Sequence, residues 1–163
     1  HFKSVNDTYG HQAGDAVLRQ LADVLRTTAR EIDRVGRYGG EEFIVLLPGA
    51  HLADAVAFAE RVRHAVDARV FRYEGGTLQR TLSAGVAAWP HPEVPHQEAL
   101  VKAADDALYV AKEMGRNRVV AFDSPTFRGR VRADGGENAA GAAGAAGASG
   151  AEATDGAGRA ATH

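Results

Sequence analysis

Residues 37–43 read Arg-Tyr-Gly-Gly-Glu-Glu-Phe, and the apolar run Ile44–Leu47 follows directly. The run has the composition of a buried strand, but glycine weakens strands and two adjacent carboxylates repel each other. A site for a polyphosphate and its metal ions would explain both features, because glycine lets a ligand approach bare backbone and carboxylate oxygens bind hard cations such as Mg²⁺. An ordinary hairpin turn whose acids face water explains this fragment equally well.

The end of the chain differs in composition from the rest. From Ala133 to His163 the sequence is almost entirely alanine and glycine and has no large apolar residue. Such a segment cannot offset the entropy that is lost on ordering. We therefore expect one domain over residues 1–124 and a disordered Ala/Gly-rich tail over residues 125–163. A domain of about 120 residues suits a single hydrophobic core.

Charge and composition exclude several classes of function. The formal net charge is −2 and no run of Lys or Arg is present, which argues against a nucleic-acid partner. The chain has no cysteine, so thiolate metal sites are excluded and a reducing compartment is favoured. No apolar stretch reaches the roughly 20 residues of a membrane helix, so we expect no membrane contact by this segment. Because the chain begins with His rather than Met, we expect it to be a piece of a longer protein.

Helix-like and strand-like patterns alternate along the first 122 residues. Two of the predicted strands meet at Gly39-Gly40, and Gly115 is the expected C-cap of the last predicted helix. Predicted helices cover about 15–30, 52–68 and 100–111, and predicted strands cover 35–38, 43–47, 70–73, 78–88 and 118–122. This order predicts an α/β fold with helices packed on one sheet.

A series of short segments between Phe2 and about Phe122 occurs in a recognisable order. They are His1-Phe2-Lys3, Asn6-Asp7, Gly10-His11, Gly14-Asp15, Arg37–Phe43, Ala59–Arg61, Ser83–Val86, Ala104–Tyr109, Ala111-Lys112 and Gly115–Arg118. In order and spacing they resemble the GGDEF domain, the catalytic domain of diguanylate cyclases, in its GGEEF variant. The resemblance implies a mixed central sheet flanked by helices, with the palm-like, ferredoxin-like core of nucleotidyl cyclases.

The resemblance also implies a reaction, in which two GTP molecules condense to cyclic di-GMP and two pyrophosphates. Each domain of a head-to-tail homodimer would bind one GTP, and Mg²⁺ or Mn²⁺ would neutralise the triphosphates for in-line attack. In the family pattern Glu41 is a metal ligand. Glu42 is either a second metal ligand or a base that helps to deprotonate the attacking hydroxyl, and both roles stay open.

Further residues match the substrate-binding positions of the family. Gly39 and Gly40 would admit the nucleotide, and Lys112 and Arg116 would bind its phosphates. Without the resemblance, these two cations would be read as solvated charges near the negative end of a helix dipole. The backbone amides near Phe2 and Lys3 are also expected to face the phosphates.

Guanine selection is assigned to Asn6 and Asp15. A carboxylate can accept hydrogen bonds from guanine N1–H and the exocyclic amine together, and adenine offers no such pair of donors. Taken alone, Asp15 would instead be read as the N-cap of the first predicted helix, and both roles can coexist. His11, Asp105 and Tyr109 also match the family, and we assign them to packing and local hydrogen bonding.

An Arg-x-x-Asp motif runs from Arg30 to Asp33, and five residues separate it from Gly39. It matches the inhibitory site of the family, where cyclic di-GMP binds away from the catalytic centre, and Arg61 fits a position that assists it. In isolation the motif would be an i, i+3 ion pair at a helix end. The alternative function is a catalytically inactive cyclic di-GMP receptor, but such a receptor would need neither the paired glutamates nor Lys112.

The chain departs from the family pattern at its beginning. Family members carry an Asp-x-Asp-x-Phe-Lys segment, and this chain starts just before Phe2-Lys3. We expect both acids, the central strand and the helix before it to lie upstream of His1. We then expect the whole protein to be an enzyme and the 163-residue piece to be inactive. We expect a cytoplasmic location, with a membrane anchor in an upstream segment left open.

Overall fold

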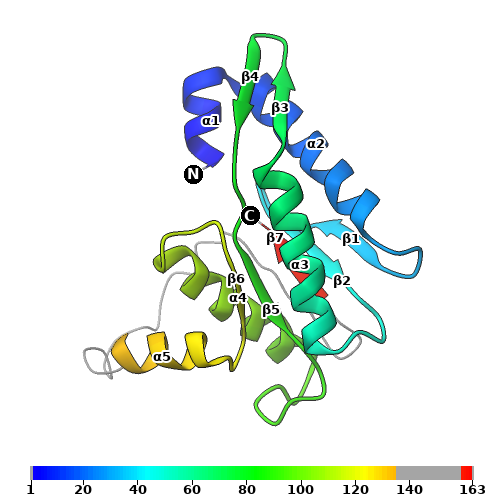
Figure 1. Ribbon diagram of the computed structural model, residues 1–163, viewed down its shortest axis with the longest axis vertical. Helices are drawn as coiled ribbons and strands as arrows, with labels where there is room; N and C mark the ends of the chain where they lie inside the picture. Colours follow the sequence, from blue (N-terminus) through cyan, green and yellow to red (C-terminus); the bar gives the residue numbers. More distant parts are fainter. Residues whose placement is uncertain (1, 135–158, 163) are drawn as a thin grey trace.

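Helices pack against a mixed β-sheet (Figure 1) in a computed structural model that describes residues 2–134 and 159–162. The helices are α1 (Phe2–Tyr9), α2 (His11–Thr28), α3 (Leu52–Asp67), α4 (Gln97–Glu113) and α5 (Pro125–Asp134). The strands are β1 (Arg34–Arg37), β2 (Phe43–Leu46), β3 (Val70–Tyr73), β4 (Gly76–Gln79), β5 (Ala84–Ala87), β6 (Val119–Ala121) and β7 (Arg159–Thr162). The predicted mixed α/β class is confirmed.

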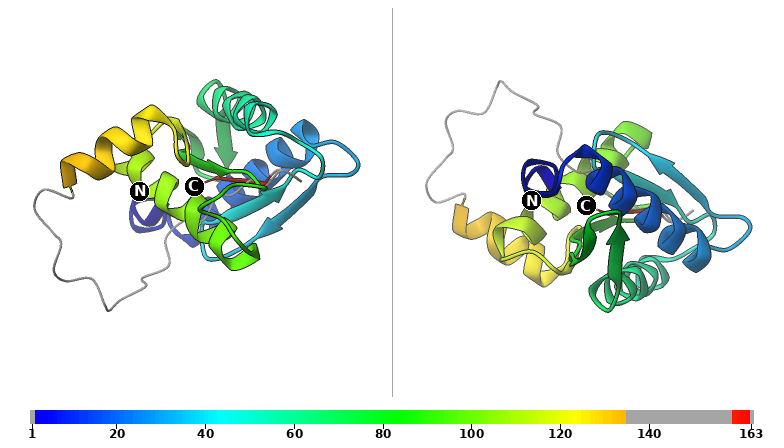
Figure 2. Two further views of the ribbon diagram at one scale, coloured as in Figure 1. Left: turned by 90° about the horizontal axis from the view of Figure 1, so that it is seen from below. Right: turned by 90° about the horizontal axis from the view of Figure 1, so that it is seen from above.

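The main sheet has the strand order β1-β2-β7-β5-β6, and β3 and β4 form a separate two-stranded sheet. Only β5 and β6 pair in parallel among the described strands; the other neighbours are antiparallel. The two views of Figure 2 show α3 and α4 on opposite faces of the main sheet. The strand predicted over 78–88 is in fact divided, because residues 80–83 separate β4 from β5.

Close backbone contact holds α4 against β5. A Cβ atom on Gly85 would lie 2.0 Å from the carbonyl oxygen of Ala104 and 2.4 Å from the backbone nitrogen of Leu108. Only glycine allows this approach, since backbone atoms cannot move aside as a side chain can. The contact fixes the position of α4, and therefore of Lys112 in its last turn.

The N-terminal region is more helical than the sequence pattern predicted. The opening around Asn6 forms α1, and α2 begins at His11, not near Asp15. Gly10, with φ 83°, is the N-cap residue of α2, so the alternative role of Asp15 as N-cap is wrong. A Cβ atom on Gly14 would lie 2.0 Å from Asn6 Oδ1, which shows how closely α1 and α2 pack. That packing is tertiary and leaves no signal in the periodicity of α2.

The expected disorder of residues 125–163 is wrong for two segments. Residues Pro125–Asp134 form α5, in which Phe127 packs on Phe122 with ring centroids 4.9 Å apart and Ser124 Oγ accepts a hydrogen bond from Phe127 N. The boundary drawn after residue 124 ignored this aromatic anchor. The second segment is β7, which pairs through its backbone with β2 and β5 and takes the middle place in the sheet. Residues 135–158 of the predicted tail lie outside the described residues.

Candidate active site

The turn between β1 and β2 carries the two glycines and the two glutamates. It is closed by hydrogen bonds from Tyr38 N to Glu42 O (2.8 Å) and from Glu42 N to Gly39 O (3.4 Å). A Cβ atom on Gly39 would lie 2.7 Å from Glu42 Oε2, so glycine at this position leaves room for the Glu42 carboxylate. No atom would lie within 4 Å of a Cβ on Gly40, which leaves the backbone there open to a ligand.

The two glutamates have different environments. Glu42 is only 2% exposed, whereas Glu41 is half-buried and faces a cavity. Burial raises the pKa of Glu42, the positive charge of Lys112 opposes this, and the negative charges of Asp105 and Glu41 add to it. Burial likewise raises the pKa of Asp105, with a further contribution from Asp106. Lys112 of α4 therefore acts on two carboxyl groups, Asp105 of its own helix and Glu42 of the β1–β2 turn.

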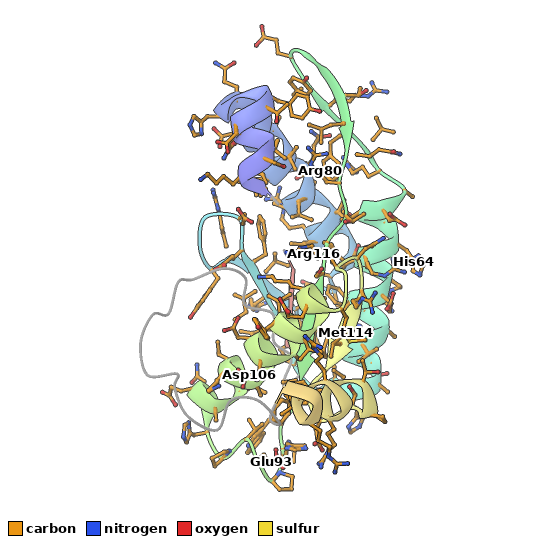
Figure 3. All side chains as sticks on the ribbon, turned by 90° about the vertical axis from the view of Figure 1, so that its left-hand side faces the viewer. His64, Arg80, Glu93, Asp106, Met114 and Arg116 are labelled. Carbon is orange, nitrogen blue, oxygen red and sulfur yellow. The ribbon has the colours of Figure 1, made fainter. Side chains whose placement is uncertain are left out.

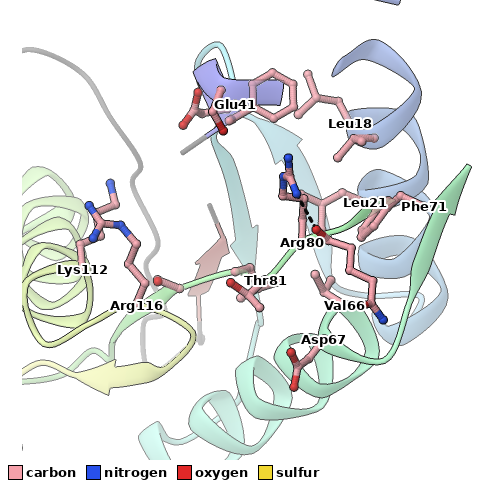
Figure 4. A pocket seen from close by; sticks show the side chains of 16 residues that line it. Leu18, Leu21, Glu41, Val66, Asp67, Phe71, Arg80, Thr81, Lys112 and Arg116 are labelled. Atoms are coloured by element: carbon pink, nitrogen blue, oxygen red, sulfur yellow. Dashed lines mark hydrogen bonds between the residues drawn. The ribbon is translucent and has the colours of Figure 1, made fainter. Parts of the chain in front are cut away.

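A cavity of about 590 Å³ opens beside Glu41 (Figure 4). Its lining comes from both N-terminal helices, the β1–β2 turn, the end of α3, the β3–β5 region and the segment at the end of α4. The lining residues are Phe2, Ser4, Val17, Leu18, Leu21, Glu41, Val66, Asp67, Phe71, Gln79, Arg80, Thr81, Leu82, Ser83, Lys112 and Arg116. Predicted site residues Phe2, Glu41, Lys112 and Arg116 thus meet at one cavity.

Other predicted substrate-binding residues do not line this cavity. Asp15 is exposed and lines a separate hollow of about 410 Å³ between α2 and the β1–β2 hairpin. Asn6 is half-buried between α1 and α2, beside Gly14. Lys3 is an exposed residue of α1. The structure therefore does not bring the residues assigned to guanine onto the lining of the main cavity.

The two phosphate-binding candidates of α4 flank a tight C-terminal turn. Gly115 has φ 102° and donates from its N–H to Lys112 O (3.2 Å), and Arg116 N donates to Ala111 O (3.0 Å). Gly115 follows the C-cap residue Met114, close to its predicted role. Lys112 and Arg116 both line the main cavity, where Figure 4 draws their side chains.

Several lining residues were not foreseen from the sequence. Arg80 adds a third cation to the lining, and its guanidinium carbon lies 5.8 Å from the centre of the Tyr9 ring. Figure 3 shows Arg80 and Arg116 between the α1–α2 pair and the end of α4. Arg80 could not be foreseen because the strand predicted over 78–88 hid the irregular segment that holds it, and no motif pointed to Asp67 at the end of α3.

The Arg-x-x-Asp motif lies between α2 and β1. Asp33 is 8% exposed, and its Oδ2 accepts a hydrogen bond from the backbone N–H of Arg30 (2.7 Å). Among the ion pairs of the described residues none joins these two side chains, and the Arg30 side chain is exposed. Asp33 Oδ1 is buried without a hydrogen-bond partner in the described part of the chain. Arg61 lies on α3 with its guanidinium over the Phe58 ring (5.7 Å).

The described residues contain neither a cluster of metal ligands nor a helix that could cross a membrane. Across residues 2–134 and 159–162, no group of three or more His, Asp or Glu side chains is placed to hold a metal ion. The carboxylates of Glu41 and Glu42 are hard oxygen donors that suit Mg²⁺ or Mn²⁺, but here they supply only part of a coordination shell. None of the described helices combines the length and apolar character that a membrane crossing requires.

Comparison with known proteins identifies the family. The sequence profile described as "Diguanylate cyclase, GGDEF domain" matches residues 1–118. Diguanylate cyclase A of Treponema denticola is 43% identical over 118 residues, which are 72% of this chain and 32% of that protein. This chain therefore spans about a third of that curated relative.

Two solved structures share the fold. The GGDEF domain of DgcB from Caulobacter crescentus, in complex with c-di-GMP, matches with a TM-score of 0.68 and 34% identity, covering 76% of this chain and 73% of that one. The active GGEEF domain of a diguanylate cyclase from Vibrio cholerae matches with a TM-score of 0.66 and 35% identity, covering 76% and 78%. This chain belongs to the GGDEF-domain family of diguanylate cyclases.

Proposed function

We propose that this domain is the catalytic part of a diguanylate cyclase that condenses two GTP into cyclic di-GMP and two pyrophosphates. The observation that carries the proposal is the meeting of Glu41 with Lys112 and Arg116 on one cavity, above the buried Glu42. The sequence Gly39-Gly40-Glu41-Glu42-Phe43 supports an active GGEEF variant, since the Vibrio cholerae relative is described as an active GGEEF domain.

The predicted site residues have distinct tasks in this proposal. Lys112 and Arg116 bind the phosphates, and Gly40 leaves the backbone open to the nucleotide. Glu41 binds a divalent ion, Mg²⁺ or Mn²⁺, which when bound neutralises the triphosphate. Glu42 is a second ligand or the base for the 3′-hydroxyl, and its carboxylate stands beside Gly39 in either role. Asn6 and Asp15 remain the candidates for guanine, which requires α1 and α2 to contact the base.

Because one domain contributes one such set of residues, two domains are needed to align two GTP molecules, and we propose a homodimer for catalysis. The proposed location is cytoplasmic.

A second proposal concerns product inhibition through Arg30, Asp33 and Arg61. The exposed Arg30 guanidinium can stack on a guanine, whereas Asp33 Oδ1 is buried and would accept from the Watson–Crick edge of that base only after the segment between α2 and β1 opens. The relative DgcB binds c-di-GMP, which supports a product site in this family. A receptor without catalysis remains the alternative function.

The test is product formation by the whole protein that contains this domain. Incubation with GTP and Mg²⁺ or Mn²⁺ should yield cyclic di-GMP on chromatography, and Glu41→Gln and Glu42→Gln should each lower the rate by at least about 100-fold. Glu74→Gln, an exposed residue in the β3–β4 turn, is the matched control and should leave the rate unchanged. Full activity in both active-site variants would refute the proposed site, and binding of cyclic di-GMP without turnover by the wild type would favour the receptor.

A further inference from the structure

We propose that Asn117 is a positioning residue, which holds the backbone of Arg116 in the conformation that presents this cation to the cavity. The inference rests on the proposed function, because it assigns Arg116 to the phosphates of a nucleoside triphosphate. It adds a part of α3 to the machinery of the catalytic site, whereas the sequence motifs assigned this helix only Arg61, at the product site.

The backbone at this turn is unusual. Gly115, Arg116 and Asn117 follow one another with φ values of 102°, 63° and 47°. The left-handed region is open to glycine and tolerated by asparagine, but it is unfavourable for arginine. Such a conformation persists where surrounding contacts determine it. Contacts around the turn must therefore hold Arg116 in the left-handed conformation.

Both polar atoms of the Asn117 side chain form hydrogen bonds with residues of α3. Arg63 Nη1 donates a hydrogen bond to Asn117 Oδ1 (3.1 Å), and Asn117 Nδ2 donates to Asp67 Oδ1 (3.4 Å). Arg63 is itself fixed by a hydrogen bond from its Nε to Glu60 Oε2 (2.7 Å), and its side chain is only 14% exposed. We call Glu60, Arg63 and Asp67 the α3 clamp.

The α3 clamp is specific in its donors and acceptors. The carboxamide of Asn117 turns its oxygen to a cation and its nitrogen to a carboxylate, the one orientation in which both contacts are hydrogen bonds. The clamp residues follow one another at spacings of three and four, so they share one face of α3. His64, the residue after Arg63, points outward from the molecule in Figure 3.

The clamp also lies beside the site. Asp67 and Arg116 both line the main cavity and are both drawn in Figure 4. Asn117 links the two residues, since its side chain is hydrogen-bonded to Asp67 and its backbone directly follows Arg116. Loss of the clamp would let the turn leave the left-handed conformation, and the Arg116 guanidinium would then no longer be pre-positioned for a phosphate.

The experiment exchanges the two polar groups of the Asn117–Asp67 contact. Asn117→Asp puts two carboxylates in contact, and the affinity for the triphosphate should fall about tenfold. The double variant Asn117→Asp/Asp67→Asn restores one donor and one acceptor and keeps an acceptor for Arg63, so the affinity should return to within about twofold of the wild type. Asp23→Asn, which changes an exposed Asp–Arg pair on α2, is the control and should have no effect.

The probe is 3′-deoxy-GTP with Mg²⁺, which lacks the attacking hydroxyl and so cannot be consumed, and the whole protein is titrated by calorimetry. The same titration in an Arg116→Ala background separates positioning from general stability. In that background Asn117→Asp should change the affinity for 3′-deoxy-GTP by less than about twofold, because the guanidinium that Asn117 positions is gone. Asn117→Gly keeps a left-handed backbone accessible without the clamp, so it should bind more weakly while its melting temperature stays near that of the wild type.

The outcomes separate the two proposals. Failure of the wild type to bind 3′-deoxy-GTP would overturn the proposed function and this inference with it. Binding by the wild type, with equal affinity in Asn117→Asp and Asn117→Gly, would overturn the positioning role alone. A loss of affinity that persists in the Arg116→Ala background would also overturn it, because the effect would not pass through Arg116.

Discussion

Two hairpins of the described chain turn through adjacent glycines, but their surroundings differ. In the β3–β4 hairpin the pairing of Tyr73 with Gly76 leaves residues 74 and 75 as the loop, and the hairpin forms its own two-stranded sheet, seen at the top of Figure 1. In the β1–β2 hairpin the pairing of Arg37 with Phe43 leaves residues 38–42 as the loop, and this loop adjoins the main cavity.

The glycines also have different tasks. Gly76 has φ 141°, which favours glycine for conformational reasons, and a Cβ on Gly75 would meet the Tyr73 ring at 2.6 Å. Gly39 and Gly40 are outside the left-handed region. Gly39 instead makes room for the Glu42 carboxylate. Adjacent glycines therefore indicate a site only when charged groups from elsewhere in the fold act on the residues beside them, as Lys112 acts on Glu42 here.

The largest expected difference between the hairpins is in activity. Gly39→Ala should force the Glu42 carboxylate to move, because the new methyl would lie 2.7 Å from Oε2. A displacement of about 1 Å can cost roughly 100-fold in rate. Gly75→Ala should change the rate by less than about twofold, because only the exposed tip of a hairpin outside the site is altered. Initial rates of cyclic di-GMP formation measure both, and equal rates in the two variants would show that the Gly39–Glu42 contact has no catalytic role.

A smaller effect is expected at the other end of β1. Arg30→Ala should weaken the binding of cyclic di-GMP about tenfold, the scale of one guanidinium contact. Initial rates should stay near those of the wild type, since Arg30 does not line the main cavity. Calorimetry with cyclic di-GMP and progress curves of the reaction measure the two quantities. Unchanged affinity would show that the exposed Arg30 is a solvated charge.

Local patterns predicted the elements of this hairpin well. The strands predicted over 35–38 and 43–47 correspond to β1 and β2, and the helix predicted over 52–68 corresponds to α3. In these segments apolar spacing and glycine positions agree with the fold. The start of α2 was missed because the contact of Gly14 with Asn6 joins two helices and has no counterpart in the periodicity of either one.

The candidate site was only partly predictable for the same reason. Glu41, Lys112 and Arg116 were accessible through motif spacing, and they do meet at one cavity. Asp67 and Asn117 are 50 residues apart and come together only because α3 packs beside the turn after α4. A contact of this kind depends on the packing of the helices on the sheet, which no short window of sequence contains.

The smallest predicted effect concerns stability and contrasts Glu42 with Glu74 of the other hairpin. Burial is the largest cause of the raised pKa of Glu42, whose ordinary value is 4.5. The folded protein therefore binds this proton more tightly than the unfolded chain, and stability falls as the pH rises from 4.5 through the folded-state pKa. Glu42→Gln removes this penalty at nearly constant volume, so at pH 7 it should raise the melting temperature even as it abolishes activity.

The rise in melting temperature of Glu42→Gln should shrink as the pH is lowered towards 4.5, because Glu42 of the wild type then becomes protonated and is neutral like glutamine. Each kcal/mol of stabilisation corresponds to about 2–8 °C in melting temperature for domains of this size range. Glu74→Gln changes an exposed carboxylate in the β3–β4 turn and should shift the melting temperature little at any pH. Thermal melts of the three proteins between pH 4.5 and pH 8 test the comparison. A lower melting temperature for Glu42→Gln at pH 7 would mean that the attraction between the Glu42 carboxylate and Lys112 outweighs the cost of burial, so that this charge pair stabilises the hairpin.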